Sequence, residues 1–407
     1  MTKLLLIVSA LGLGMAWLAD AAGGNYLGHW VGAHFGGRLA SLGGSKVPDI
    51  AEYVTGRIRE ALWLASLVWL GCVLTGSLWP RLAKSSSRLT PWIMGILLFL
   101  ALNLGCLLAA QTALFWLILR GTSVENQAQF HAKEILLREV KIRPLLALVG
   151  SSQSQAQFTE EIFNAEVKGK AWMMELHYPG SNASDVFFVG ERFSPRYVSG
   201  FVYYVSFPNI YSKHPDPPTG RDLLRLRDLP ASLSLGAWSH FNPVTARYTA
   251  LGMFFPLFQY RASFQHALIG SAALEPKTQN APMQSSSAIA DGFGFGPEAD
   301  FQKMAFRRFL ENSAAKGQRV IVIVGQMNPD YEAQVSPVIR QDFQDFLREC
   351  AATHPNLTLV WQNELLVQPP DAYRDHAHVT DETAEKFTKA FARWYLAHPL
   401  SPVPSAQ

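Results

Sequence analysis

The pattern of hydrophobic positions divides the chain into two parts of different character. The first 120 residues contain three apolar segments without a charged residue, at residues 4–19, 61–79 and 92–119. A helix needs about 20 apolar residues to cross the hydrocarbon core of a bilayer, so the second and third segments are long enough to span it. The first segment is shorter and runs into an Ala-Asp-Ala-Ala stretch, so a cleaved signal peptide is an alternative to a third span. We therefore predict a membrane region over residues 1–120.

Positive charges near these segments predict their orientation. The loop between the second and third segments contains Arg81, Lys84 and Arg88 and no acidic residue. Short loops rich in Lys and Arg face the cytoplasm. Lys3, before the first segment, is consistent with a cytoplasmic N-terminus. We therefore expect residues 121–407 to form a domain on the extracytoplasmic side of the membrane.

Beyond the membrane region, short apolar runs alternate with longer amphipathic segments. Runs rich in β-branched and aromatic residues predict strands, and the amphipathic segments predict helices. Such alternation is typical of a parallel sheet covered by helices on both faces, so we predict a three-layer α/β domain. Insertions interrupt it within about residues 221–300, as a helical part at 221–270 and a mobile loop at 271–295. The predicted strands are 145–149, 171–176, 201–205, 319–324 and 357–361, and the predicted helices are 159–166, 297–316, 336–353 and 380–397.

Two short polar motifs in this domain carry the residue types of a nucleophile and a base. Ser152 lies in a Gly-Ser-Ser-Gln-Ser turn directly after the apolar run 145–149. Asp375 precedes His378 by three residues, a spacing that lets the carboxylate hold one imidazole nitrogen. Serine is a weak nucleophile at neutral pH and needs such an oriented base. Together the motifs predict acyl chemistry by a Ser-His-Asp triad, although each alone also fits a loop or a helix cap.

Two further positions between these motifs are candidates for stabilising an oxyanion. Gly180 follows the predicted strand 171–176, and a glycine lets a backbone N–H approach a substrate closely. Asn209 follows the predicted strand 201–205 in a Ser-Phe-Pro-Asn sequence. A side-chain amide at the carboxyl end of a strand supplies another donor. Asn328, after a later strand, is the rival for this role.

The order of these motifs resembles that of the SGNH (GDSL-type) hydrolases over roughly residues 141–397. That family has a serine turn, a later glycine, an asparagine after a strand and a C-terminal Asp-x-x-His. The resemblance implies that Ser152 is the nucleophile, that His378 is the base and that Asp375 orients the base. The oxyanion hole that it implies comprises the backbone N–H of Ser152 together with Gly180 and Asn209.

Two motifs depart from the family pattern toward its acyl-transfer branch. Gly-Ser-Ser at residues 150–152 replaces the usual Gly-Asp-Ser, and Ser-Phe-Pro-Asn at residues 206–209 replaces the usual Gly-x-Asn-Asp. Both resemble the DltD proteins of teichoic-acid D-alanylation and the alginate O-acetylation proteins. The resemblance implies O-acylation, with acetyl as the expected group, of a cell-surface or secreted polysaccharide on the periplasmic side of a bacterial inner membrane. It also implies a membrane-bound O-acyltransferase as the partner that supplies the acyl group.

Two other functions stay open from the sequence. The same triad in a hydrolase makes a periplasmic esterase that removes acyl groups from glycans or lipids, since transfer and hydrolysis share an acyl-serine. The other alternative is a membrane-anchored assembly protein with a vestigial triad. The complete set of Ser, Asp and His argues against that alternative.

The histidine pattern and the net charge bear on other classes of site. His376 and His378 form a His-x-His pair beside Asp375, which also fits a zinc or manganese site. The remaining histidines are scattered without a second paired motif, so we expect no metal and no other cofactor, with His376 as a neighbour of the site. A net charge of +3 without a basic cluster argues against nucleic acid as a partner.

Overall fold

A computed structural model shows the fold of the second part of the chain. It describes residues 144–213, 224–241, 243–254 and 292–399, together with residues 105, 130, 133–134, 137–138 and 140. Apart from residue 105, these residues belong to one compact unit formed by Gln129–Phe254 and Leu274–Gln407. The predicted segments 4–19, 61–79 and, except for residue 105, 92–119 lie outside the described residues, so their insertion into a membrane stays a prediction. Within the described ranges, no helix has both the length and the apolar character that a membrane span requires.

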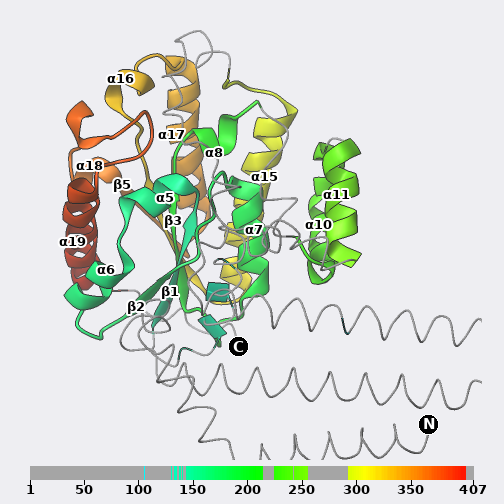
Figure 1. Ribbon diagram of the computed structural model, residues 1–407, viewed down its shortest axis with the longest axis horizontal. Helices are drawn as coiled ribbons and strands as arrows, with labels where there is room; N and C mark the ends of the chain where they lie inside the picture. Colours follow the sequence, from blue (N-terminus) through cyan, green and yellow to red (C-terminus); the bar gives the residue numbers. More distant parts are fainter. Residues whose placement is uncertain are drawn as a thin grey trace, which may run out of the picture. The chain divides into compact units, whose positions relative to one another are not determined.

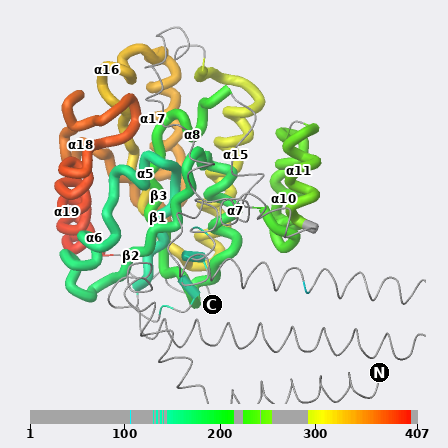
Figure 2. The backbone as a smooth tube through the Cα atoms, viewed as in Figure 1, coloured from blue at the N-terminus to red at the C-terminus, as the bar shows by residue number. Residues whose placement is uncertain are grey.

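Five strands form a parallel sheet at the centre of the unit (Figures 1 and 2). Their order is β2-β1-β3-β4-β5, and every neighbouring pair is parallel. The predicted strands and the α/β class are therefore confirmed, with each strand boundary within one residue of its prediction. The strands are β1 (Leu145–Gly150), β2 (Trp172–Glu175), β3 (Gly200–Val205), β4 (Arg319–Val324) and β5 (Leu357–Trp361).

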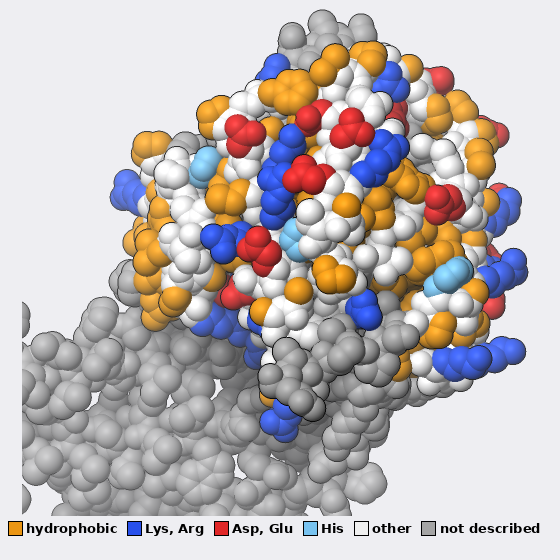
Figure 3. All heavy atoms as spheres, turned by 180° about the vertical axis from the view of Figure 1, so that it is seen from behind, with side chains coloured by type: hydrophobic (Ala, Val, Ile, Leu, Met, Phe, Trp, Pro, Cys, Tyr) orange, Lys and Arg blue, Asp and Glu red, His pale blue; other side chains and the backbone are white. Residues whose placement is uncertain are grey.

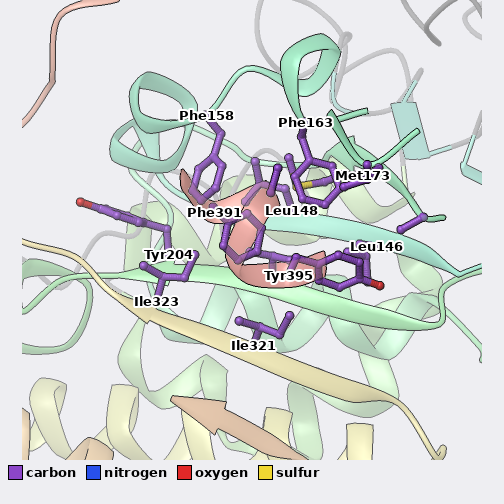
Figure 4. Packing of buried hydrophobic residues seen from close by; sticks show 14 of the residues in the cluster. Leu146, Leu148, Phe158, Phe163, Met173, Tyr204, Ile321, Ile323, Phe391 and Tyr395 are labelled. Carbon is purple, nitrogen blue, oxygen red and sulfur yellow. The ribbon is translucent and has the colours of Figure 1, made fainter. Parts of the chain in front are cut away.

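Helices cover both faces because side chains on both sides of each strand are apolar. On one face, α6 (Glu160–Glu166) and α19 (Asp381–Ala397) pack against the sheet through a cluster of buried side chains that includes Leu148 (Figure 4). The rings of Phe163 and Phe391 stack there, with their centroids 5.6 Å apart. This contact joins α19 to α6, two helices that are far apart in the sequence.

Other helices cover the opposite face of the sheet (Figure 1). They are α7 (Ala183–Arg192), α15 (Pro297–Ala315) and α17 (Pro337–Thr353). Phe201 of β3 points to this side, where its ring centroid lies 5.3 Å from that of Phe309 on α15. The sheet thus has helices on both faces, as the alternating pattern predicts.

The four helices predicted from the amphipathic segments are confirmed as α6, α15, α17 and α19. The sequence pattern does not predict helix α7, a ten-residue helix whose residues from Ala183 to Gly190 are all buried, Ser184 and Asp185 among them. The other helices that the sequence pattern does not predict are short. They are α5 (Ser152–Gln157), for which only the start was expected, α8 (Pro208–Tyr211), α16 (Pro329–Glu332), α18 (Gln362–Leu365) and the 3-10 turn η4 (Pro370–Ala372).

The described residues of the predicted helical insertion, 224–241 and 243–254, form mainly helices and 3-10 turns. Arg192, at the end of α7, donates to both carboxylate oxygens of Asp228 at 3.1 and 2.6 Å and so joins the insertion to the sheet-covering helices. The elements are η1 (Leu226–Asp228), α10 (Leu229–Leu235), η2 (Ala237–His240) and α11 (Pro243–Phe254).

The end of the predicted mobile loop 271–295 is fixed to the domain. Of this loop the structure describes residues 292–295. The N–H of Gly294 donates to the carbonyl of Tyr211 at 3.0 Å, and Lys213 donates to Gly292 at 3.0 Å. Helix α15 then begins at Pro297, so the insertion ends slightly before the predicted residue 300.

Acidic and basic side chains are interspersed on the face of the domain shown in Figure 3. Pairs of opposite charge also occur between α15 and α17, such as Arg307 with Glu349 at 3.0 Å. Exposed pairs of this kind contribute about 0–1 kcal/mol each to stability. The buried aromatic contacts, rather than these pairs, therefore hold the layers together.

Candidate active site

Ser152 lies at the carboxyl edge of the sheet, on the turn between β1 and α5. Gly150, the last residue of β1, has a φ of 140°, and a Cβ there would lie 2.5 Å from Ser154 Oγ. Glycine is therefore required at this position. Ser151 caps α5, because its Oγ accepts the N–H of Gln153 at 3.3 Å. The turn thus holds a partly exposed Ser152 where ligands bind in parallel α/β sheets.

Three side chains from opposite ends of the domain form a hydrogen-bonded relay. Nε2 of His378 lies 2.9 Å from Oγ of Ser152. Nδ1 of His378 lies 2.8 Å from Oδ2 and 3.0 Å from Oδ1 of Asp375. With the Nδ1 proton donated to Asp375, Nε2 carries the lone pair that accepts a proton from the serine hydroxyl. The structure therefore brings together the three residues that the sequence predicts as nucleophile, base and orienting acid.

The loop that carries Asp375 and His378 is held by its own hydrogen bonds. Oδ1 of Asp375 accepts the backbone N–H groups of Ala377 and His378, each at 2.8 Å. The N–H of Arg374 donates to the carbonyl of His378 at 2.9 Å. Partial burial opposes ionisation of Asp375, but the Ala377 N–H and the His378 ring outweigh it and hold the pKa of this carboxyl below its usual value. Asp375 is therefore ionised at neutral pH and able to stabilise a protonated imidazole.

Gly180 lies in a loop tied directly to the serine turn. The N–H of Tyr178 donates to the carbonyl of Gly150 at 2.9 Å, which brings this loop beside the end of β1. Gly180 has a φ of 78°, a left-handed conformation that favours glycine. It lines the same pocket as Ser152. The backbone of this loop is thus available to a bound acyl group.

Asn209 also lines this pocket, and a network of buried polar groups fixes its side chain. Its Oδ1 accepts the N–H of Ser206 at 2.8 Å and the Ser206 hydroxyl at 3.2 Å. Its Nδ2 donates one proton to the carbonyl of Ser181 at 2.9 Å. An amide has two N–H donors, so the second remains for a ligand. The single proton of the Ser206 hydroxyl is shared between Oδ1 of Asn209 and Oε1 of Gln153, which links Asn209 to the residue after the serine.

Asn328, the rival of Asn209, has a different position. It caps α16, with its Oδ1 accepting the N–H of Asp330 at 3.0 Å, and does not line the pocket. Its backbone N–H donates to the carbonyl of His376 at 3.0 Å. Asn328 thus holds the loop that carries the base, while Asn209 is the one of these two candidates that lines the pocket, as Asn182 also does.

The pocket beside Ser152 has a volume of about 370 Å³ and combines aromatic, amide and carboxylate side chains. Its outer residues come from segments far apart in the sequence, and no local motif marks them. The lining residues that the sequence pattern did not identify are Gln153, Phe293, Glu298, Gln302, Met327 and Tyr331, with several small polar residues.

His376 lines the pocket as a neighbour of the relay, as the sequence predicts. Its ring centroid lies 4.9 Å from that of Tyr331 and 6.5 Å from that of His378. Burial, helped by His378 and opposed by Asp375, lowers the pKa of His376. In the part of the chain that the structure describes, no group of three or more His, Cys, Asp or Glu side chains is arranged to hold a metal ion.

Comparisons with known proteins add no identification. No protein-family model matches the chain, and no curated protein matches it. The candidate roles of the site residues therefore depend on their geometry and on the order of the motifs.

Proposed function

We propose that the protein is a membrane-anchored extracytoplasmic acyltransferase with an SGNH-like catalytic domain. It O-acylates a cell-surface or secreted polysaccharide, with acetyl as the expected group, through an acyl-serine intermediate. The observation that carries this proposal is the relay from Ser152 through His378 to Asp375 at the carboxyl edge of a parallel sheet. Such a relay is the arrangement that activates a serine hydroxyl for attack on an acyl carbon.

In the first half-reaction, Oγ of Ser152 attacks the carbonyl carbon of the donor while Nε2 of His378 takes the hydroxyl proton. The carbonyl oxygen becomes an oxyanion, which the backbone N–H groups of Ser152 and Gly180 and the second N–H of Asn209 stabilise. Asp375 stabilises the imidazolium that forms. Collapse of the tetrahedral intermediate breaks the bond to the leaving group, which receives the proton from His378.

In the second half-reaction, a glycan hydroxyl replaces the leaving group. It gives its proton to Nε2 of His378 as its oxygen attacks the carbonyl carbon of the acyl-serine. The Ser152 oxygen then leaves and recovers the proton from His378. The acyl group ends as an ester on the glycan, and the enzyme returns to its starting state.

The use of a glycan hydroxyl instead of water distinguishes transfer from hydrolysis. The Gly-Ser-Ser turn and the Ser-Phe-Pro-Asn motif resemble those of the acyl-transfer branch, and this supports transfer. The pocket volume of about 370 Å³ leaves space for a ligand beside the serine, which both transfer and hydrolysis require. The predicted membrane segments would hold the domain near an integral membrane-bound O-acyltransferase, the partner that we propose as the acyl donor.

Replacing Ser152 by alanine in cells tests the function. We expect Ser152→Ala to lower the acyl content of the surface polysaccharide to the level of a deletion strain, measured by mass spectrometry after alkaline release. Ser234→Ala is the matched control, because Ser234 is an exposed serine outside the site. A polysaccharide with more acyl groups would identify a deacylase. An unchanged acyl content would support an assembly protein with an unused triad.

A further inference from the structure

The pocket beside Ser152 has two walls that the acyl-serine chemistry does not use. The ring wall consists of Tyr331 and His376. The acid wall consists of Glu298 and Gln302. Both lie in the same pocket as the hydroxyl that carries the acyl group, so they are available to a second substrate.

The ring wall presents neutral ring surfaces in a fixed arrangement. Tyr331 is 7% exposed, and its ring plane makes an angle of 35° with that of His376. The hydrogen bond from the N–H of Asn328 to the carbonyl of His376 fixes the backbone that carries this imidazole. Burial lowers the pKa of His376 and so favours its neutral form. Neutral ring faces of this kind pack against the C–H face of a pyranose, while their polar atoms accept or donate hydrogen bonds.

The acid wall is also fixed, and it carries a negative charge. Oε1 of Glu298 accepts the side-chain N–H of Gln302 at 2.7 Å, and Oε2 lies 3.4 Å from Nδ1 of His240. Gln302 is 2% exposed, and its own oxygen accepts the N–H of Ser184 at 2.8 Å. Each carboxylate oxygen accepts more than one hydrogen bond, so Glu298 has capacity for sugar hydroxyls. A carboxylate or phosphate on the ligand would meet a like charge here.

We infer that this pocket receives an uncharged pyranose unit of the acceptor glycan, with Tyr331 and His376 packing against its ring and Glu298 accepting its hydroxyls. This inference rests on the proposed function and adds to it the chemical class of the acceptor. Glu298 excludes uronate and phosphate groups from the reacting unit and thereby acts as a specificity-determining residue. The hydroxyl that is acylated is the one that the bound ring places at Nε2 of His378.

Competing acceptors test this inference on the full-length protein in detergent. The donor is 4-nitrophenyl acetate, and the acceptors are a β-1,4-mannan oligosaccharide and the mannuronate oligosaccharide of the same linkage. We expect acetyl transfer to the mannan to be at least about tenfold faster than transfer to the mannuronate oligosaccharide. The reason is that a ligand carboxylate beside Glu298 lowers the affinity by more than about tenfold. Glu298→Gln should lower the ratio of the transfer rate to mannan over the transfer rate to mannuronate. Glu298→Lys should lower this ratio further or reverse the preference.

Glu311→Lys is the matched control for Glu298→Lys, because both substitutions change the net charge equally. Glu311 lies on the same helix, with a side chain that is 49% exposed. It should leave the ratio unchanged. Equal or faster transfer to mannuronate by the wild-type protein overturns the inference, as does a ratio that Glu298→Gln and Glu298→Lys do not move. A burst of 4-nitrophenol without transfer to either oligosaccharide also overturns it.

A binding measurement separates this inference from the proposed chemistry. The Ser152→Ala protein cannot form an acyl-serine, so calorimetry reports on the pocket alone. We expect it to bind the mannan oligosaccharide at least about tenfold more tightly than mannuronate. If the wild-type protein shows no 4-nitrophenol burst while this preference is present, the proposed function fails and the binding inference stands. If the preference is absent, the inference fails whatever the chemistry.

Discussion

Asn209→Ala should lower kcat for acyl transfer by about 10²–10³-fold, which corresponds to about 2.7–4 kcal/mol of transition-state stabilisation. The structure leaves one N–H of this amide for a ligand, since the other donates to Ser181 at 2.9 Å. This decrease in kcat is the expected effect of removing one preorganised hydrogen-bond donor from an oxyanion hole that also contains backbone N–H groups. KM for a small ester should change little, because the donor acts mainly on the charge that develops in the transition state.

The same substitution has a cost in stability that must be measured separately. Asn209 is 5% exposed, and its Oδ1 accepts both the N–H and the hydroxyl of Ser206. Loss of this acceptor leaves a buried donor unsatisfied, which costs about 1–3 kcal/mol in the free energy of unfolding. Urea unfolding of wild-type and variant protein gives this value. Kinetics are then compared at a temperature at which both are folded.

The assay is the steady-state release of 4-nitrophenol from 4-nitrophenyl acetate, with and without a glycan acceptor. Asn328→Ala is the matched control, because Asn328 caps α16 outside the pocket. It should cost about 1 kcal/mol in stability and much less in kcat than Asn209→Ala. Asn209→Asp retains the acceptor for Ser206 and removes the donor, so its kcat should also fall. A folded Asn209→Ala protein with near-normal kcat would refute the assignment of Asn209 to the oxyanion hole.

Three other predictions concern the triad, the pH dependence of stability and the topology. His378→Ala should cost about as much activity as loss of the serine, and Asp375→Asn should lower kcat by about 10⁴-fold without unfolding the domain, as judged by kinetics and circular dichroism. Burial lowers the pKa of His177 to about 4, below the usual histidine pKa of about 6.5. The neutral His177 side chain therefore contributes fully to the free energy of unfolding above about pH 6.5, and this contribution is lost as the pH falls through about 4. Urea titrations should therefore show an acid-dependent loss of about 3 kcal/mol that is absent in His177→Gln, and an equal loss in both proteins would refute it. A reporter fused after Gly121 should be active only outside the cytoplasm and one fused at Ser85 only inside, and the reverse pattern would invert the topology.

The central sheet was predictable because its strands are short apolar runs bounded by polar turns. β1 and β4 are buried almost throughout, so their sequences are continuous hydrophobic runs. These runs are too short for a typical helix, which indicates strands. Helix α7 was harder to recognise because it is short and its polar residues Ser184 and Asp185 are buried together with its apolar ones. Short helices such as α8 and α16 contain too few residues for a helical period to be visible.

The relay was predictable because its parts are local motifs, whereas the rest of the pocket is not. The spacing of three positions from Asp375 to His378 allows their contact within one loop, and the Gly150 turn presents Ser152 at a strand end. Glu298 and Tyr331 reach the pocket only because the sheet order brings their elements to one edge. The choice between Asn209 and Asn328 likewise required the three-dimensional structure, because both residues follow a strand of the same sheet.

The most direct test of the central claim is rapid-quench peptide mass spectrometry of the full-length protein mixed with 4-nitrophenyl acetate and no acceptor. We predict one acetyl group on the peptide that contains Ser152, formed as fast as the first equivalent of 4-nitrophenol is released. This adduct should disappear when an acceptor glycan is added, with the acetyl group recovered as an ester on the glycan. Turnover without an adduct on Ser152, or with the adduct on another residue, would contradict the acyl-serine mechanism.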